Sequence, residues 1–240
     1  MSVRRATIVL IHGANGSGAT MKPLADGLDP HVGVFAPNLL GQGGRPPQEI
    51  TVENMVADLI EQLDAANISR SFIFGYSSGG ILALYIARHF PERVIGVSAL
   101  APKYIFDRRT VSHWTYLANP ERVKTVPNRA QELAETHQPQ NWEDVVNNTR
   151  RFFESLGRKP PLSEADLREI RAPSLLFASN QDQVVPFAES VALGKLIPNA
   201  RTVIFSGQCH PLHVVPFAAI AVAIRNWIDE VQAGVASTNA

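Results

Sequence analysis

Short apolar runs and longer amphipathic stretches alternate along the chain. Six runs rich in β-branched and aromatic residues lie at residues 6–11, 32–36, 71–75, 94–100, 174–178 and 201–205. Most are apolar at nearly every position, which is typical of strands that are covered on both faces. Helical patterns separate these runs, at residues 52–66, 78–90, 188–196 and 216–231. Strand alternating with helix predicts an α/β fold with a doubly wound, mainly parallel sheet of about six strands.

The alternation stops over residues 103–161, a span too long for a structureless loop. Helix-like pieces lie within it at residues 129–136 and 142–156. We therefore predict two parts, an α/β core of residues 1–102 and 162–240 and an inserted helical cap of residues 103–161. The cap also contains two of the three tryptophans, and we expect its aromatic side chains to pack the cap's own small core in preference to a pocket.

One junction between a predicted strand and a predicted helix carries a chemical motif, Gly75-Tyr76-Ser77-Ser78-Gly79. A serine hydroxyl is a weak nucleophile unless it is held clear of its neighbours and beside a base. Gly75 and Gly79 remove the side chains that would collide across a sharp turn with Ser77 at its apex. Ser77 is therefore the predicted nucleophile, because the frame centred on Ser78 lacks the first glycine.

A serine nucleophile needs a histidine base and a carboxylate that orients the base. Asp182 follows the fifth apolar run and His210 follows the sixth, so both are expected in loops after strand ends. The chain order Ser77, Asp182, His210 is the order expected for a sheet of this type. These three are the predicted catalytic residues. His213 is a second histidine nearby, and we prefer His210 because it comes directly after the strand-ending turn.

A tetrahedral intermediate also needs hydrogen-bond donors for its oxyanion. We predict the backbone N–H of Ser78 as one donor, because Ser78 opens a helix whose dipole favours negative charge. The second donor is expected at Ala14, in the glycine-rich loop after the first strand. His12 in the same loop is expected to hold the loop by hydrogen bonds and not to transfer protons.

Composition narrows the classes of function. The 240 residues carry 22 lysines and arginines against 22 aspartates and glutamates, so nothing favours nucleic acid or a membrane as a partner. Cys209 is the single cysteine, which excludes an internal disulfide. No signal-peptide pattern opens the chain, and we expect a cytoplasmic protein. We also expect a small-molecule substrate and no cofactor or metal, and the sequence leaves homo-oligomerisation open.

Taken together, these motifs resemble the α/β-hydrolase superfamily. The loop at His12, the turn at Ser77, Asp182 and His210 all match its pattern, and the similarity extends over nearly the whole chain. The resemblance implies a Ser-His-Asp triad, no cofactor and a cap that shapes the pocket. Three features depart from it, one of which is Cys209 at a position usually held by Gly. The superfamily's first two antiparallel strands have no counterpart here, and Asn38 begins a loop that normally starts with Asp.

From these residues we predict a serine hydrolase that cleaves a small carboxylic ester or lactone through an acyl-enzyme. The alternative on the same fold is a C–C bond hydrolase or a menaquinone-pathway-type lyase, although the lyase branch typically has Arg where this chain has Ile81. A small-molecule receptor with little turnover is a further alternative. The cap carries ten lysines and arginines against seven aspartates and glutamates, and we assign this excess to a solvated face in preference to a substrate carboxylate.

Overall fold

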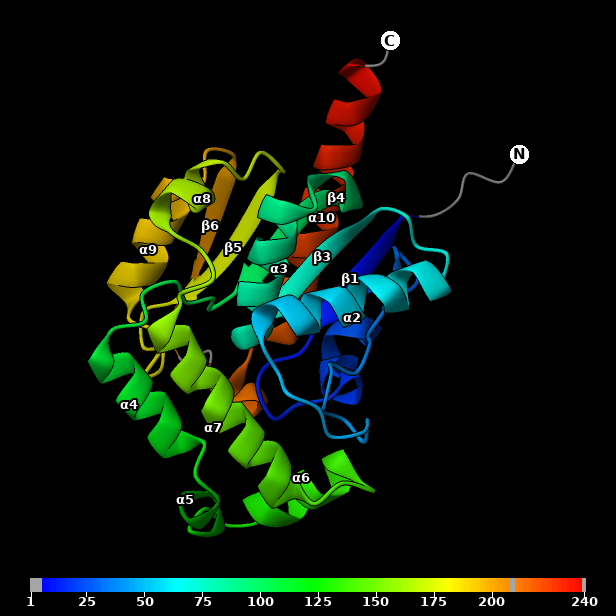
Figure 1. Ribbon diagram of the computed structural model, residues 1–240. Coiled ribbons are helices and arrows are strands. Elements are labelled where there is room, and N and C mark those ends of the chain that lie inside the picture. The colour runs from blue at the N-terminus through cyan, green and yellow to red at the C-terminus, as the bar shows by residue number, and fades with distance from the viewer. Residues whose placement is uncertain (1–5, 208–209, 239–240) are drawn as a thin grey trace.

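Six parallel strands form one sheet in the order β2-β1-β3-β4-β5-β6 (Figure 1). The computed structural model of the protein describes residues 6–207 and 210–238, with side chains described as far as Gly234. The strands are β1 (Thr7–Ile11), β2 (Gly33–Phe35), β3 (Ser71–Tyr76), β4 (Val94–Leu100), β5 (Ser174–Ser179) and β6 (Ala200–Phe205). The predicted parallel α/β sheet is confirmed, and each strand end lies within one residue of its expected position.

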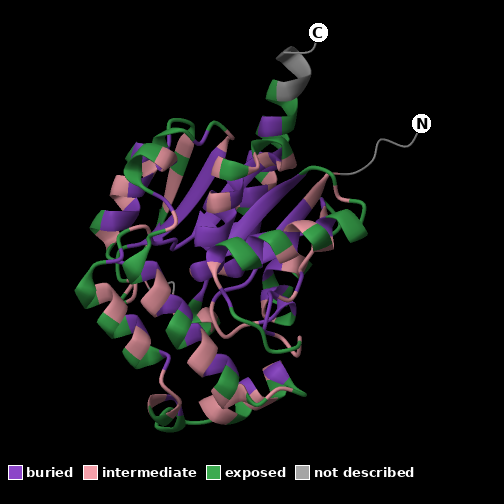
Figure 2. Ribbon diagram, viewed as in Figure 1, coloured by how far each residue is buried: buried purple, intermediate pink, exposed green. Residues whose placement is uncertain are grey.

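Helices cover both faces of the sheet, so the central strands are buried along nearly their whole length (Figure 2). Alternate residues point to opposite faces: Val9 and Ile11 of β1 join one apolar cluster, and Ile8 and Leu10 join the other. The helices on the first face are α2 (Val52–Ala65), α3 (Ser78–His89) and α9 (Phe187–Leu196), and those on the second are α1 (Lys22–Leu28) and α10 (Phe217–Thr238).

A 3-10 turn at Gly18–Met21 and the short helix α1 lie between β1 and β2, where the sequence pattern predicts no helix. With 7 residues, α1 is too short for apolar periodicity to stand out. It also contains Gly27, and a Cβ there would lie 2.7 Å from the Cβ of Ala221 on α10. The glycine that weakens the helical pattern is therefore needed for close packing between the two helices.

The helix α10 presents one apolar face to the sheet. Ile220, Ile224 and Ile228 follow each other at intervals of four residues and are buried, whereas Val222 is exposed. This face closes the second apolar cluster. None of the helices in the described part of the chain combines the length and the hydrophobicity that a membrane span requires.

Helices occupy the chain between β4 and β5, where the sequence predicts a helical insertion. Four cap helices lie together across one end of the sheet (Figure 1), and a fifth leads back to β5: α4 (Arg108–Leu117), α5 (Pro120–Lys124), α6 (Arg129–His137), α7 (Trp142–Arg158) and α8 (Glu164–Arg168). The two expected helical pieces correspond to α6 and α7. The helix α4 was not expected, because β-branched and aromatic residues make up much of its length.

Ion pairs fix both junctions between the cap and the core. Where the chain leaves β4, the buried Glu189 of α9 pairs with Lys103 and accepts the backbone N–H groups of Tyr104 and Ile105, each at 3.0 Å. Where the chain returns, Arg88 of α3 pairs with Asp166 at 3.3 Å and with Glu169 at 2.5 Å. Each junction is therefore held by a residue of a core helix.

Candidate active site

Ser77 lies at the turn between β3 and α3 in a backbone conformation that few residues adopt. Its φ is 53° and its ψ is −117°. Holding a residue in such a sparsely populated backbone conformation costs on the order of 1–3 kcal/mol of folding free energy. The N–H of Ser77 donates to the carbonyl of Leu100 at 2.9 Å, which ties the turn to β4. A Cβ on Gly75 would lie 2.2 Å from the carbonyl oxygen of Gly79, and one on Gly79 would lie 2.4 Å from that of His12. Both glycines of the motif are therefore needed for the close approach of backbones.

Asp182 and His210 come together in the loops that follow β5 and β6. The ionised carboxylate can only accept, so Nδ1–H of His210 donates to Oδ2 of Asp182, at 2.8 Å. The other oxygen, Oδ1, accepts the backbone N–H groups of Val184 at 2.8 Å and Val185 at 3.0 Å. Because the Asp182 side chain is only 2% exposed and bonded on both oxygens, its position is fixed.

Opposing effects act on the pKa of Asp182. Burial raises the pKa of the carboxyl, because it disfavours the charged form. The hydrogen bond and charge of His210, together with the two backbone N–H groups, outweigh burial and lower the pKa below its ordinary value. The carboxylate therefore stays ionised at neutral pH and holds the proton of His210 on Nδ1, which leaves Nε2 as the basic nitrogen.

Ser77 and His210 both line a cavity of about 710 Å³ between the strand ends and the cap. This volume is within the range of small-molecule sites. The Nε2 atom of His210 is buried and has no hydrogen-bond partner among the described residues. The structure thus places the predicted nucleophile and base on one cavity without a hydrogen bond between them. Such bonds often form only once the substrate is bound.

The alternative histidine, His213, lies in the 3-10 turn Leu212–Val214 and is exposed. It borders the same cavity, but the Asp182 carboxylate binds His210 and not His213. The geometry therefore favours His210 as the base. The single cysteine, Cys209, lies outside the described residues.

The loop after β1 places Ala14 in the cavity wall. The next residue, Asn15, has a φ of 56°, and its Oδ1 accepts the hydroxyl of Thr149 at 2.7 Å. Thr149 is a buried residue of α7, so a cap helix holds the residue beside Ala14. Ser78 is the first residue of α3, where a backbone N–H has no partner within the helix. Oxyanion binding by Ala14 and Ser78 stays a prediction.

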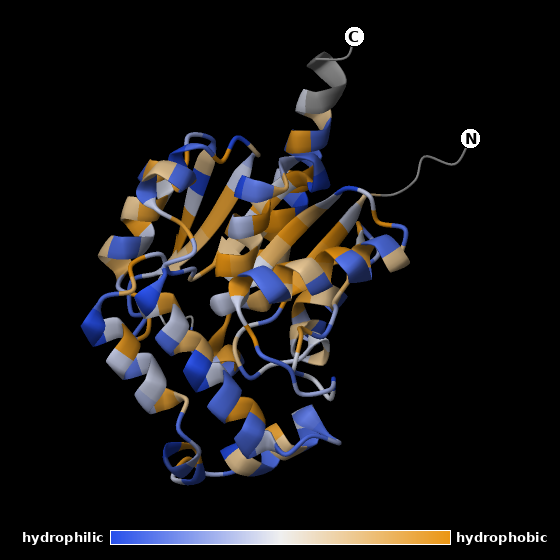
Figure 3. Ribbon diagram, in the orientation of Figure 1, coloured by the Kyte–Doolittle hydropathy of each residue, from blue (hydrophilic) through white to orange (hydrophobic). Residues whose placement is uncertain are grey.

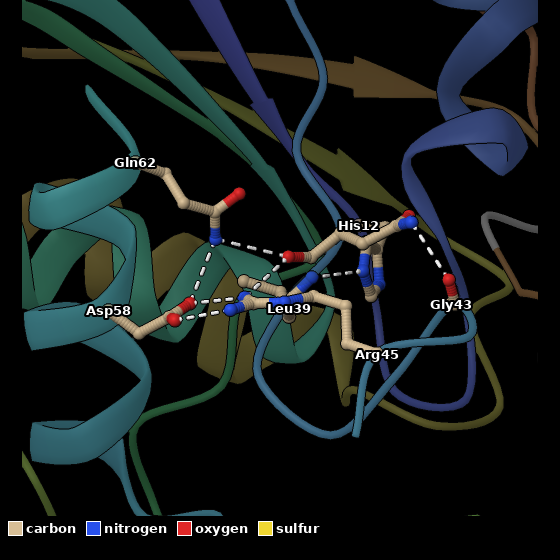
Figure 4. Close-up of polar contacts among 7 residues, drawn as sticks. His12, Leu39, Gly43, Arg45, Asp58 and Gln62 are labelled. Carbon is tan, nitrogen blue, oxygen red and sulfur yellow. Dashed lines mark hydrogen bonds and ion pairs between the residues drawn. The ribbon is translucent and has the colours of Figure 1, made fainter. Parts of the chain in front are cut away.

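His12 ties the loop after β1 to the loop after β2. Its Nδ1–H donates to the carbonyl of Gly13 at 2.8 Å. Its Nε2 accepts the N–H of Leu39 at 3.1 Å (Figure 4). The side chain is fully buried, and this desolvation lowers the pKa of His12 to about 4. One donor and one acceptor are what a neutral imidazole offers. His12 therefore holds this loop by hydrogen bonds, as the sequence led us to expect.

Asn38 organises the loop after β2 where the superfamily normally has Asp. Its Nδ2 donates to the carbonyl of Gly43 at 2.8 Å, and its Oδ1 accepts a backbone N–H of the loop after β1 at 2.7 Å. The carbonyl of Asn38 accepts from Arg45 at 3.1 Å, and Arg45 pairs with Asp58 through bonds of 2.5 and 2.6 Å (Figure 4). An aspartate could not donate to Gly43, so the amide makes a network that the carboxylate could not.

The cap supplies one wall of the cavity. The sequence did not show which cap residues form this wall. The ring of Trp114 packs against Phe153 at 4.8 Å and Phe106 at 6.0 Å between ring centres. Trp114 and Phe153 also line the cavity, so for these two the expectation of packing in preference to pocket lining holds only in part. The available signal was the gathering of aromatic residues in the cap, but which face each one presents depends on how the helices cross.

The sequence of this chain is similar to a known protein family and to individual proteins named as hydrolases. Residues 8–223 match the family model for the alpha/beta hydrolase family. A Pseudomonas putida relative named 2-hydroxy-6-oxo-2,4-heptadienoate hydrolase is 27% identical, and the match covers 84% of this chain and 81% of the relative. The RutD protein of Pantoea ananatis, named for carbamate hydrolysis, is 23% identical over 93% of this chain and 88% of its own length.

The fold is also found among solved structures. The enol-lactonase from Burkholderia xenovorans superimposes with a TM-score of 0.77 at 17% identity, covering 94% of this chain and 92% of the other. An identity this low shows a shared fold alone. Because the family model spans most of the chain, and the sheet and the Ser77 turn agree with it, the chain belongs to the alpha/beta hydrolase family.

Proposed function

We propose that this protein is a serine hydrolase that cleaves a small carboxylic ester or lactone through an acyl-enzyme intermediate. The observation that carries the proposal is the position of His210. Its Nδ1–H donates to the buried Asp182, and its Nε2 has no hydrogen-bond partner among the described residues. His210 and Ser77 line the same cavity. An imidazole held in this way acts as a general base toward a serine hydroxyl.

In the acylation step, Oγ of Ser77 attacks the carbonyl carbon while its proton passes to Nε2 of His210. The electron pair of the C=O bond moves to oxygen, and the N–H groups of Ala14 and Ser78 stabilise this oxyanion. One such donor is worth about 3 kcal/mol in a comparable hydrolase. When the C=O bond forms again, the bond to the leaving oxygen breaks and His210 gives its proton to the alcohol. Asp182 stays ionised and stabilises the imidazolium.

In the deacylation step, water attacks the acyl carbon and gives a proton to Nε2 of His210. The second oxyanion collapses, the bond to Oγ breaks, and Ser77 regains its proton from His210. The balance is one ester and one water converted to one acid and one alcohol, or one lactone and one water converted to a hydroxy acid. Both steps need neutral His210, so we expect activity to fall on acidification.

The test follows nitrophenol release from p-nitrophenyl esters, from acetate to octanoate, with the wild type and Ser77→Ala. We expect the variant to lose at least about a thousandfold in kcat, because loss of the nucleophile in comparable hydrolases costs about a millionfold. Ser112→Ala removes a hydroxyl from an exposed position of α4 and serves as the matched control. Equal release by the wild type and Ser77→Ala would remove Ser77 from the mechanism.

C–C bond hydrolysis is a second candidate, favoured by the names of two relatives. These are the 2-hydroxy-6-oxo-2,4-heptadienoate hydrolase above and a Pseudomonas putida 2-hydroxymuconate semialdehyde hydrolase that is 28% identical over 83% of this chain. Turnover of a vinylogous diketone with no release from any ester would select this candidate. Turnover of esters that disappears in Ser77→Ala would select the proposed one.

A further inference from the structure

The cavity at Ser77 has an uncompensated positive charge in its cap wall. The aspartates, glutamates, lysines and arginines among its lining residues are Arg122, Arg129 and Glu132. Arg129 and Glu132 lie on α6 and pair with each other at 3.0 Å. Arg122 lies on α5 and has no acidic partner among the described residues. One cation is therefore available to a ligand.

The neighbours of Arg122 orient its guanidinium but do not neutralise it. Its Nη1 donates to the hydroxyl of Thr125 at 2.6 Å, and the guanidinium carbon lies 5.8 Å from the centre of the Tyr116 ring. Both neighbours are uncharged, and the remaining N–H groups of a guanidinium match the two oxygens of a carboxylate. Thr125 and Tyr116 thus restrict the orientation of the Arg122 guanidinium, which keeps its positive charge at the cavity wall.

A second side chain with an unused donor belongs to the same wall, on the neighbouring helix α4. Trp114 is 4% exposed and lines the cavity, and its buried Nε1–H has no hydrogen-bond partner among the described residues. A buried indole N–H normally finds an acceptor, because leaving it unpaired costs about 1–3 kcal/mol. An acceptor atom of a bound substrate would remove this cost.

We propose that the substrate carries a carboxylate at the end remote from the scissile carbonyl, and that Arg122 binds this carboxylate with Trp114 as a second donor. The proposal rests on the proposed function and names the substrate class of the same site. Ser77 and His210 belong to the core side of the cavity, whereas Arg122 and Trp114 belong to the cap side. A substrate that spans the cavity therefore places its carbonyl and its carboxylate at opposite ends, with an apolar chain between them.

The test compares mono-p-nitrophenyl adipate with p-nitrophenyl hexanoate. The two acyl chains have the same length and differ in a terminal carboxylate or methyl group. The readout is the ratio of kcat/KM for the adipate to that for the hexanoate, after subtraction of spontaneous release. We expect a ratio above one for the wild type and a fall of about tenfold in Arg122→Gln, the effect of losing a charge-assisted hydrogen bond.

Arg109→Gln is the matched control, because it removes the same charge from an exposed position of α4 that does not line the cavity. It should leave the ratio unchanged. Trp114→Phe keeps an aromatic ring and should lower the ratio by a smaller factor than Arg122→Gln. Hydrolysis of the hexanoate with a ratio that is the same in the wild type and Arg122→Gln would overturn this inference alone. Hydrolysis of neither ester would overturn the proposed function and this inference with it.

Discussion

The sheet and the outer part of the cap differ in how they are held in place. Two apolar clusters cover the faces of the sheet, whereas α5, α6 and the first half of α7 enclose a small cluster of Val123, Leu133 and Val146. Polar residues dominate these cap helices, while the strands are apolar (Figure 3). Polar contacts join the outer cap to the core, from Thr149 to Asn15 and from His137 to Gly43. Apolar packing therefore holds the sheet on both faces, whereas the outer cap is held by one small apolar cluster and a few polar contacts.

Two glycine substitutions compare the packing at the Ser77 turn of the core with the packing between two cap helices, and the first should have the largest effect on stability. Gly75→Ala places a Cβ against the backbone of Gly79, 2.2 Å from its carbonyl oxygen, and no side-chain rotation relieves that contact. We expect the free energy of unfolding to fall by about 3 kcal/mol or more. Urea unfolding followed by circular dichroism measures the change.

Gly157→Ala is the counterpart in the cap. There the new Cβ meets Cγ2 of Val111 at 2.6 Å, which is a side-chain atom that can move. The gain in helix propensity is up to about 1 kcal/mol and offsets the cost of moving Val111, so we expect a net change within about 1 kcal/mol. A loss as large as that of Gly75→Ala would show that the cap is packed as tightly as the core.

Lowering the pH should reduce stability through the buried His12 of the core more than through the buried His137 of the cap. Burial lowers the pKa of His12 to about 4 and also lowers the pKa of His137. The unfolded chain takes up the His12 proton near its ordinary pKa of about 6.5, and the folded chain only near 4, so stability is lost as the pH falls between these values. We expect His12 to account for a loss of about 3 kcal/mol over this window.

Urea midpoints between about pH 7 and pH 4 measure this effect for the wild type, His12→Gln and His137→Gln. The pH dependence should shrink most in His12→Gln and less in His137→Gln. If the stability of His12→Gln kept the full pH dependence of the wild type, the burial of His12 would not be the cause of that pH dependence.

A further expected effect is on activity and concerns the contact through which the cap reaches the predicted oxyanion site. Thr149→Val keeps the shape of the side chain and removes the hydroxyl that donates to Asn15, beside Ala14. Loss of one neutral hydrogen bond is worth about 1 kcal/mol, so we expect kcat to fall about fivefold on p-nitrophenyl esters. Thr149→Ser keeps the hydroxyl and should restore kcat. An unchanged kcat in Thr149→Val would show that the cap does not position this loop.

Much of the core could be predicted from the sequence because its signals are local. Buried parallel strands are apolar at nearly every position, so the runs that contain Phe72 and Leu176 mark strands without any tertiary information. The prediction of Ser77 rests on its flanking glycines, and the predictions of Asp182 and His210 rest on their places after strand ends. Direct bonding of Asp182 to His210 agrees with that assignment.

The cap was less predictable because its contacts are not local. Whether Trp114 or Arg122 faces the cavity depends on the angles at which α4 and α5 cross their neighbours, and no periodic pattern encodes those angles. The contact between Thr149 and Asn15 joins residues 134 positions apart. The sequence indicated a positive cap, but the pairing of Arg129 with Glu132 shows that Arg122 is the arginine of the cavity wall without an acidic partner among the described residues.

Residues of the core hold the chain at the two points where it enters and leaves the cap. Glu189 holds the segment that enters the cap and Arg88 holds the segment that leaves it, and both are residues of the core. A foreign helical segment inserted after Phe106 and before Leu162 would therefore meet an intact framework. Directed evolution could recombine caps on this one scaffold, and new substrate selectivity could arise by replacing a module while Ser77 stays where it is.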